Sequence, residues 1–199
     1  MGSNHTEWKV LESEYIIQRP WLTAKREKLE LPDGRIVPEY YVLEYPDWVN
    51  VIAITKDGRM ILERQYRHAA KRTDYEIPCG VMENGETPLK AAQRELEEET
   101  GFGGGEWSEI MQIYANPSSM TNKTYCFLAK GVEKVTNPHL DPTEELSVHM
   151  LGQDEVRRLV LSGQIIQSLM VAPLLRYFYE TFPEGDLHLI SGRGERKFY

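Results

Sequence analysis

Residues 80–102, GVMENGETPLKAAQRELEEETGF, predict a capped helix with a cluster of carboxylates near its end. Thr87 is a favourable N-cap residue, and Pro88 suits the first helical position. Gly101 can end the helix in the left-handed conformation that glycine adopts easily. The apolar stripe that we expect to dock on a sheet consists of Leu89, Ala92 and Leu96.

Three glutamates in the last turns of this helix form a candidate metal site. Glu95 and Glu99 are four residues apart and therefore lie one above the other, with Glu98 one position further round the helix. Negative charge is unfavourable near a helix C-terminus, and neighbouring carboxylates repel each other unless a cation joins them. A solvated acidic face is the alternative interpretation. The crowding favours a hard cation such as Mg²⁺ or Mn²⁺, which prefers oxygen ligands.

The same stretch resembles the Nudix box, G-x5-E-x7-R-E-U-x-E-E-x-G-U, in which U is an apolar residue. The residues that match it are Gly80, Glu86, Arg94, Glu95, Leu96, Glu98, Glu99, Gly101 and Phe102. Members of this family hydrolyse nucleoside diphosphates linked to another group and use divalent metals held by the box. The resemblance implies the α/β class, with a Nudix α/β/α sandwich around a mixed sheet and a small N-terminal antiparallel sheet.

Within the box, the resemblance implies metal ligation by carboxylates and by one backbone carbonyl. Glu95 and Glu99 are the first-choice ligands, and Glu98 is either a third ligand or the residue that orients the attacking water. The carbonyl of Cys79 is expected to be a further ligand, a role that needs no particular side chain. Arg94 is expected to hold a box carboxylate by an ion pair. The cofactor is then Mg²⁺, with Mn²⁺ as the alternative.

The composition is that of a globular enzyme rather than a nucleic-acid or membrane protein. The 199 residues are 41% apolar, enough for a domain with a sizeable core plus an appendage. A formal net charge of −8 argues against nucleic acid and anionic membranes as partners. The two cysteines imply no disulfide framework, and the sequence has neither an apolar signal core nor an apolar run of membrane length. We therefore expect a cytoplasmic protein.

Regular runs along the chain predict the remaining elements. The expected strands are residues 8–17, 22–31, 37–45, 49–55, 60–66, 107–114, 123–129 and 146–151. Two helices are expected at 153–162 and 165–179, the second interrupted near Pro173. Together with the helix of the box, this pattern favours a mixed sheet flanked by helices.

The chain divides into three predicted segments. Residues 1–46 predict a small antiparallel sheet, because a Pro-Asp-Gly turn separates two strand-like runs. Residues 47–182 are expected to form the catalytic domain, and the role of the tail, residues 183–199, stays open. In the ADP-ribose pyrophosphatase branch of the family, a comparable N-terminal sheet is exchanged between subunits and helps to bind the base. The resemblance implies a homodimer, with Trp21 and Tyr40 as candidate base-binding rings; packing within the protein is their alternative role.

Three further residues are similar to substrate-binding positions of related enzymes. Arg67 ends a Gln-Tyr-Arg sequence that related hydrolases carry near the diphosphate, and its planar fork suits phosphate oxygens; a surface ion pair is the alternative. Glu76 begins Glu-Ile-Pro-Cys-Gly and is either a substrate-facing carboxylate or a structural strand-end residue. Pro117 follows Gly101 by sixteen residues, an offset associated with ADP-ribose pyrophosphatases. Family members often have a glycine soon after it, where this chain has Ser118, Ser119 and Met120.

An acidic loop, DPTEE at residues 141–145, precedes the last expected strand. The resemblance implies a catalytic glutamate in this loop, with Glu144 as the first choice and Glu145 as the second. A pair of solvated loop acids is the alternative. Either glutamate can act as a general base if it reaches the attacking water.

The predicted function is a metal-dependent hydrolase of ADP-ribose or a related nucleoside diphosphate sugar, giving a nucleoside monophosphate and a sugar phosphate. One alternative is a preference for GDP-mannose or another sugar nucleotide. A second, from a different class, is a sensor that binds ADP-ribose without cleaving it. The complete set of box carboxylates argues against the sensor, because binding alone does not need all of them.

Overall fold

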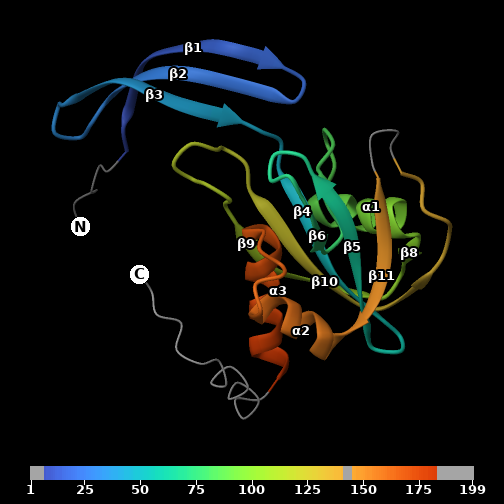
Figure 1. Cartoon of the computed structure of the whole chain (residues 1–199). Coiled ribbons are helices and arrows are strands. Elements are labelled where there is room, and N and C mark those ends of the chain that lie inside the picture. The colour runs from blue at the N-terminus through green and yellow to red at the C-terminus, as the bar shows by residue number, and fades with distance from the viewer. Residues whose placement is uncertain (1–6, 141–144, 183–199) are drawn as a thin grey trace, which may run out of the picture. The chain divides into compact units, whose positions relative to one another are not determined.

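The computed structural model describes residues 7–140 and 145–182, and the chain forms two compact units (Figure 1). The first unit comprises Met1–Asp47 together with Tyr114–Lys123, and the second comprises Trp48–Ile113 and Thr124–Tyr199. A short segment from the middle of the chain therefore belongs to the N-terminal unit.

The first unit is built on a three-stranded antiparallel sheet, as the sequence predicts. Its strands are β1 (Lys9–Arg19), β2 (Leu22–Glu30) and β3 (Ile36–Glu44), in the order β1-β2-β3. The turn between β2 and β3 closes with a 2.9 Å hydrogen bond from the Gly34 N–H to the Leu31 carbonyl, and Gly34 has a φ of +83°. The 114–123 segment pairs with β3 through a bridge between Leu43 and Met120.

The second unit contains an eight-stranded mixed sheet. Its strands are β4 (Trp48–Thr55), β5 (Arg59–Arg67), β6 (Arg72–Glu76), β7 (Cys79–Val81), β8 (Phe102–Gly103), β9 (Glu106–Ile113), β10 (Thr124–Lys134) and β11 (Leu146–Gly152). The main order is β11-β5-β4-β10-β8, while β6 pairs with β5, β7 with β4 and β9 with β10. Only β4 and β10 among these pairs are parallel.

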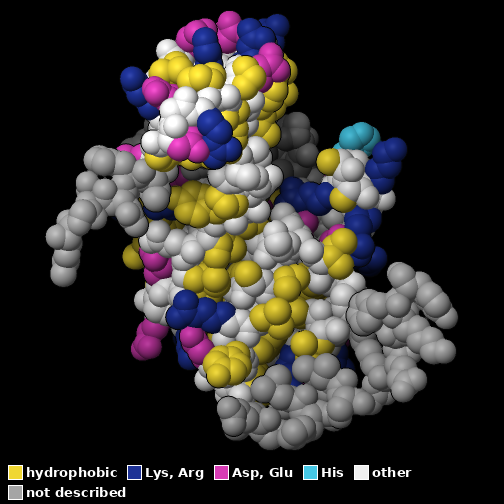
Figure 2. Space-filling model, turned by 90° about the vertical axis from the view of Figure 1, so that its left-hand side faces the viewer, with side chains coloured by type: hydrophobic (Ala, Val, Ile, Leu, Met, Phe, Trp, Pro, Cys, Tyr) yellow, Lys and Arg dark blue, Asp and Glu magenta, His cyan; other side chains and the backbone are white. Residues whose placement is uncertain are grey.

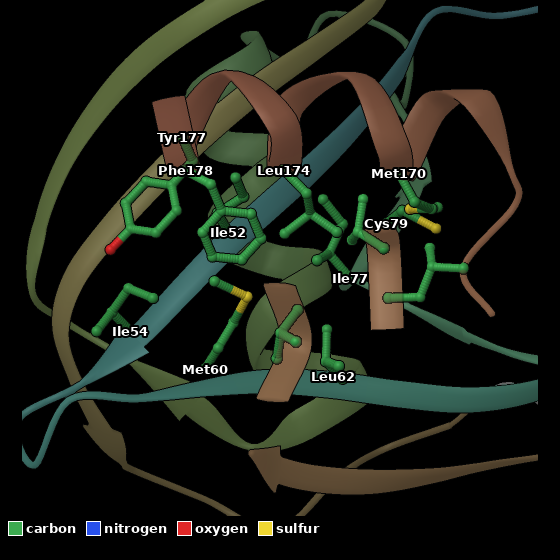
Figure 3. Close-up of a cluster of buried hydrophobic side chains, with 13 residues drawn as sticks. Ile52, Ile54, Met60, Leu62, Ile77, Cys79, Met170, Leu174, Tyr177 and Phe178 are labelled. Carbon is green, nitrogen blue, oxygen red and sulfur yellow. The ribbon is translucent and has the colours of Figure 1, made fainter. Parts of the chain in front are cut away.

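Helices cover both faces of this sheet, as the expected α/β/α sandwich requires. The helices are α1 (Pro88–Thr100), α2 (Gln153–Leu161) and α3 (Ser168–Thr181). Alternate residues of β4 are buried on opposite faces: Val51 packs in the cluster with α1, and Ile52 packs in the cluster with α2 and α3. Figure 3 shows Met170 and Leu174 of α3 above strand residues such as Ile52. None of the helices in the described part of the chain is long and apolar enough to span a membrane.

The ends of α1 follow the prediction, but its buried stripe differs. The Thr87 side chain accepts a hydrogen bond from the Lys90 N–H, and Gly101 is left-handed with a φ of +70°. Leu89 is 39% exposed, so its predicted docking on the sheet was wrong. Ala91 is fully buried instead. The helix turns its alanine face toward the sheet, and these small side chains let the helix approach the sheet closely.

Pro173 does not interrupt α3, contrary to the prediction. A proline lacks the N–H that would bond to the carbonyl four residues earlier, here that of Leu169. The Asn50 side chain supplies the missing donor, because its Nδ2 lies 2.7 Å from the Leu169 oxygen. Asn50 is 1% exposed and comes from β4, so a tertiary contact sustains the helix through the proline.

Candidate active site

Arg94 gathers the carboxylates of the box around one guanidinium group. All five of its N–H groups are used. The acceptors are Glu86 Oε1 at 3.1 Å and Oε2 at 3.0 Å, Glu95 Oε1 at 2.9 Å, Glu98 Oε2 at 3.0 Å and the Val81 carbonyl at 3.0 Å. Arg94 therefore links α1 to β7 and to the loop that carries Glu86.

Two of the predicted metal ligands are buried against β7. Glu99 Oε2 accepts a 3.0 Å hydrogen bond from the Cys79 N–H. The carboxylate of Glu95 lies against the Cα of Gly80, and an added Cβ there would come within 2.1 Å of the Glu95 Cδ. Glycine at position 80 thus leaves the space that the Glu95 carboxylate occupies. Glu98, by contrast, has a half-exposed side chain.

The charges of these groups stabilise one another. Hydrogen bonds with Glu86 raise the pKa of Arg94, and the same bonds with Arg94 lower the pKa of Glu86. Both groups therefore stay ionised. Burial raises the pKa of Cys79 well above its ordinary value, and the nearby Glu99 and Glu76 carboxylates raise it further. Cys79 is accordingly a neutral thiol rather than a reactive thiolate.

Arg67 and Glu76 form a two-point ion pair beside this cluster. Arg67 Nε lies 2.9 Å from Glu76 Oε1, and Arg67 Nη2 lies 2.5 Å from Oε2. Glu76 is only 2% exposed, whereas the side chain of Arg67 is partly accessible. The hydrogen bond with Glu76 raises the pKa of Arg67, and the negative charges of Glu76 and Glu99 act in the same direction. The pair holds a cation next to the carboxylates of α1.

The residues present are suited to a divalent metal. Their donors are carboxylate oxygens, which hard cations prefer, and the glycine at position 80 provides a cradle beside Glu95. Within residues 7–140 and 145–182, no three His, Cys, Asp or Glu side chains are already grouped as a metal site. Arg94 holds Glu95 and Glu98 in this arrangement, so a metal would share those carboxylates with the guanidinium or displace it.

The other predicted site residues lie in different parts of the chain. Glu144 falls outside the described residues, and Glu145 is exposed immediately before β11. Trp21, Tyr40 and Pro117 belong to the first unit. Trp21 is 86% exposed at the β1–β2 turn, whereas the Tyr40 hydroxyl donates to the Ser118 carbonyl in the Pro117 loop. Tyr40 thus contributes to packing within its unit, while the Trp21 ring is accessible to a ligand or to another protein surface.

The fold brings three further residues to this region that the sequence patterns do not predict. Glu63 is 2% exposed and lies opposite Glu76 in the β5–β6 register. Val81 contributes its carbonyl to Arg94. His139 lines a hollow of about 550 Å³ together with Arg94, Glu97 and Glu98. Cross-strand register could have indicated Glu63, but no local spacing signals His139, which lies far from the box in sequence.

Comparison with known proteins places this site in a family. A model of the NUDIX domain matches residues 44–169, and a model of the nucleoside diphosphate sugar hydrolase N-terminal domain matches residues 8–43. The chain belongs to the Nudix hydrolase family. Nudix hydrolases generally need a divalent metal, in agreement with the carboxylates of α1.

Relatives of known name support this assignment to the Nudix family. The chain is 31% identical over 160 residues to an ADP-ribose pyrophosphatase of Bacillus subtilis, covering 80% of this chain and 86% of the relative. It is 28% identical over 171 residues to an ADP-ribose pyrophosphatase of Mycobacterium tuberculosis, covering 85% and 82%. A crystal structure of an ADP compounds hydrolase matches with a TM-score of 0.76 at 21% identity, covering 94% of this chain and 97% of that one. This last similarity concerns the fold alone.

Proposed function

We propose that this Nudix hydrolase is a magnesium-dependent pyrophosphatase for ADP-ribose and related nucleoside diphosphate sugars. Its products are a nucleoside monophosphate and a sugar phosphate. The observation that carries the proposal is the pair of buried carboxylates, Glu95 and Glu99, beside the Arg67–Glu76 ion pair. Relatives named as ADP-ribose pyrophosphatases and the match of the N-terminal model support the choice of substrate.

The metal would be held by Glu95, Glu98, Glu99 and the backbone carbonyl of Cys79. When bound there, Mg²⁺ would offset the charge of the diphosphate and promote attack by water. The protein contributes the arrangement of these oxygens: Arg94 draws Glu95 and Glu98 together, and the Cys79 N–H orients Glu99.

Arg67 is the proposed contact for the diphosphate of the substrate. Arg67, held by Glu76, has a partly accessible side chain whose guanidinium can donate to phosphate oxygens. The first unit carries three further candidate substrate-binding residues, Trp21, Tyr40 and Pro117, and the exposed Trp21 ring can stack on a nucleobase. Glu144 or Glu145 is the proposed general base, since both belong to the acidic loop that leads into β11.

A substrate panel tests this proposal. The protein is incubated with Mg²⁺ and, separately, ADP-ribose, GDP-mannose, UDP-glucose, ADP-glucose, NADH or a diadenosine polyphosphate, and the products are identified. Preferential conversion of ADP-ribose to AMP and ribose 5-phosphate supports the proposal. Preference for GDP-mannose would leave the proposed reaction unchanged but would identify a different substrate. Binding without hydrolysis would instead support the sensor function.

Replacing both Glu144 and Glu145 with glutamine is expected to lower kcat by about a hundredfold and to change KM much less. The reason is that a general base acts in proton transfer rather than in ground-state binding. Steady-state kinetics on the preferred substrate measure the effect, with Glu133→Gln, an exposed residue of β10, as a control. An unchanged kcat would show that neither loop glutamate is the base.

We further propose that the protein is a homodimer joined through its N-terminal sheet. β1 is an edge strand with an unpaired side, and it exposes a run of large apolar residues. These include Val10, Leu11, Tyr15, Ile16 and Ile17. Figure 2 shows hydrophobic side chains among charged ones on this sheet, at the top of the view.

Light scattering is expected to give twice the mass of one chain. Ile16→Glu should shift the protein toward monomer, because it places a charge on the apolar edge strand. The exposed Ile166, which precedes α3 in the second unit, provides a matched control as Ile166→Glu. A wild-type protein that is monomeric at all concentrations tested would contradict the dimer.

A further inference from the structure

The hollow beside α1 is partly lined by His139, a residue to which the proposed function gives no role. It is lined by Arg94, Glu97 and Glu98 of α1 and by His139. His139 belongs to the connection between β10 and β11, just before the acidic loop. The hollow therefore lies between the helix that carries the carboxylates and the segment that leads to the proposed general base.

Three backbone hydrogen bonds attach this connection to the end of α1. The N–H groups of Val135 and Thr136 donate to the Gly101 carbonyl at 2.9 and 3.1 Å. The His139 N–H donates to the Glu98 carbonyl at 2.7 Å. The position of His139 is thus set by main-chain contacts to the same helical turn that carries Glu98, and it survives any change of its side chain.

Among the described side chains that line the hollow, His139 is the one with an uncommitted hydrogen-bond donor. Arg94 has committed all five N–H groups to other acceptors. The carboxylates of Glu97 and Glu98 offer hydrogen-bond acceptors. The imidazole of His139 makes no hydrogen bond, ion pair or ring contact with any other residue in the described ranges. An imidazole has at least one N–H donor in either protonation state.

We infer that His139 is a substrate-binding residue, whose ring N–H donates a hydrogen bond to an oxygen of the substrate's diphosphate. This inference rests on the proposed function. The diphosphate is the part of the substrate that must lie beside Glu98 if that carboxylate serves the metal. A donor in the same hollow then contacts phosphate oxygens rather than the base or the sugar, so its contribution is the same for different nucleotide sugars.

Steady-state kinetics with two nucleotide sugars test this role. His139→Ala is expected to raise KM about tenfold for both substrates and to change kcat less than about threefold, since one hydrogen bond to a charged group is lost. His139→Asn retains an N–H donor on a short side chain and should restore most of the loss. His149→Ala is the matched control, because His149 lies on β11 and contacts Ser147 and Tyr75 instead.

Several results would overturn the inference. One is a KM of His139→Ala within twofold of the wild-type value. Another is a KM of His139→Asn as high as that of His139→Ala. A third is a rise in KM for only one of the two nucleotide sugars. If the wild-type protein hydrolyses nothing, the proposed function fails, and calorimetry with ADP-ribose and Mg²⁺ decides the role of His139. Binding about tenfold weaker in His139→Ala would then support the contact, and equal binding, or no binding by the wild type, would refute it.

Discussion

Glu99→Gln is expected to lower turnover by about a thousandfold while leaving the fold intact. The loss corresponds to about 4 kcal/mol of transition-state stabilisation, the scale on which a bound metal acts in such reactions. The amide oxygen of glutamine can still accept the hydrogen bond from the Cys79 N–H, now 3.0 Å from Glu99 Oε2. What the substitution removes is the negative charge that would hold the metal.

The measurement is kcat at saturating Mg²⁺ together with the melting temperature of each variant. The melting temperature of Glu99→Gln should stay near or above that of wild type, because a buried carboxylate four residues from Glu95 on the same helix is neutralised. Glu106→Gln, at an exposed position at the start of β9, is the control for loss of one charge. Turnover of Glu99→Gln close to that of wild type would remove Glu99 from the metal site.

Gly101→Ala is expected to destabilise the protein by about 3–5 kcal/mol and to reduce activity. Two costs add at this position: a left-handed φ of +70° and a clash of the new Cβ, 2.3 Å from the Thr136 carbonyl oxygen. The clash pushes away the connection that is bonded to the end of α1 and that carries His139. A loss of structure in this connection should therefore accompany the loss of stability.

Gly104 provides a matched control for this substitution. It also has a φ of +70°, but no atom lies within 4 Å of the position of an added Cβ. Gly104→Ala should therefore cost only the backbone strain, about 1–2 kcal/mol. Denaturant unfolding of both variants measures the difference. Equal losses of unfolding free energy in the two variants would show that the clash with the Thr136 carbonyl does not contribute to the effect of Gly101→Ala.

The sequence predicted the parts of the fold that depend on local chemistry. The N-cap and left-handed end of α1 follow from Thr87 and Gly101, because each acts on neighbouring backbone groups. The spacing of Glu95 and Glu99 on one helix placed both carboxylates together, and the structure shows both buried. Alternating and apolar runs likewise located β1 to β5, which differ from the predicted ranges by a few residues at the ends.

The remainder depends on contacts between distant segments, which local pattern does not encode. The continuity of α3 through Pro173 requires Asn50, which lies more than a hundred residues earlier. The exposure of Leu89 depends on which face of α1 packs against the sheet. The position of His139 depends on its bond to Glu98 across the β10–β11 connection. Each of these contacts forms only in the folded protein, where the order of the strands in the sheet brings distant segments together.

The most direct test of the whole account is hydrolysis of ADP-ribose in ¹⁸O-labelled water, with and without Mg²⁺, followed by mass spectrometry of the products. We predict AMP and ribose 5-phosphate, one of them carrying a single ¹⁸O atom, and no products when the metal is removed with EDTA. Recovery of intact ADP-ribose in the presence of Mg²⁺, or equal hydrolysis in EDTA, would contradict a metal-dependent pyrophosphatase built on the carboxylates of α1.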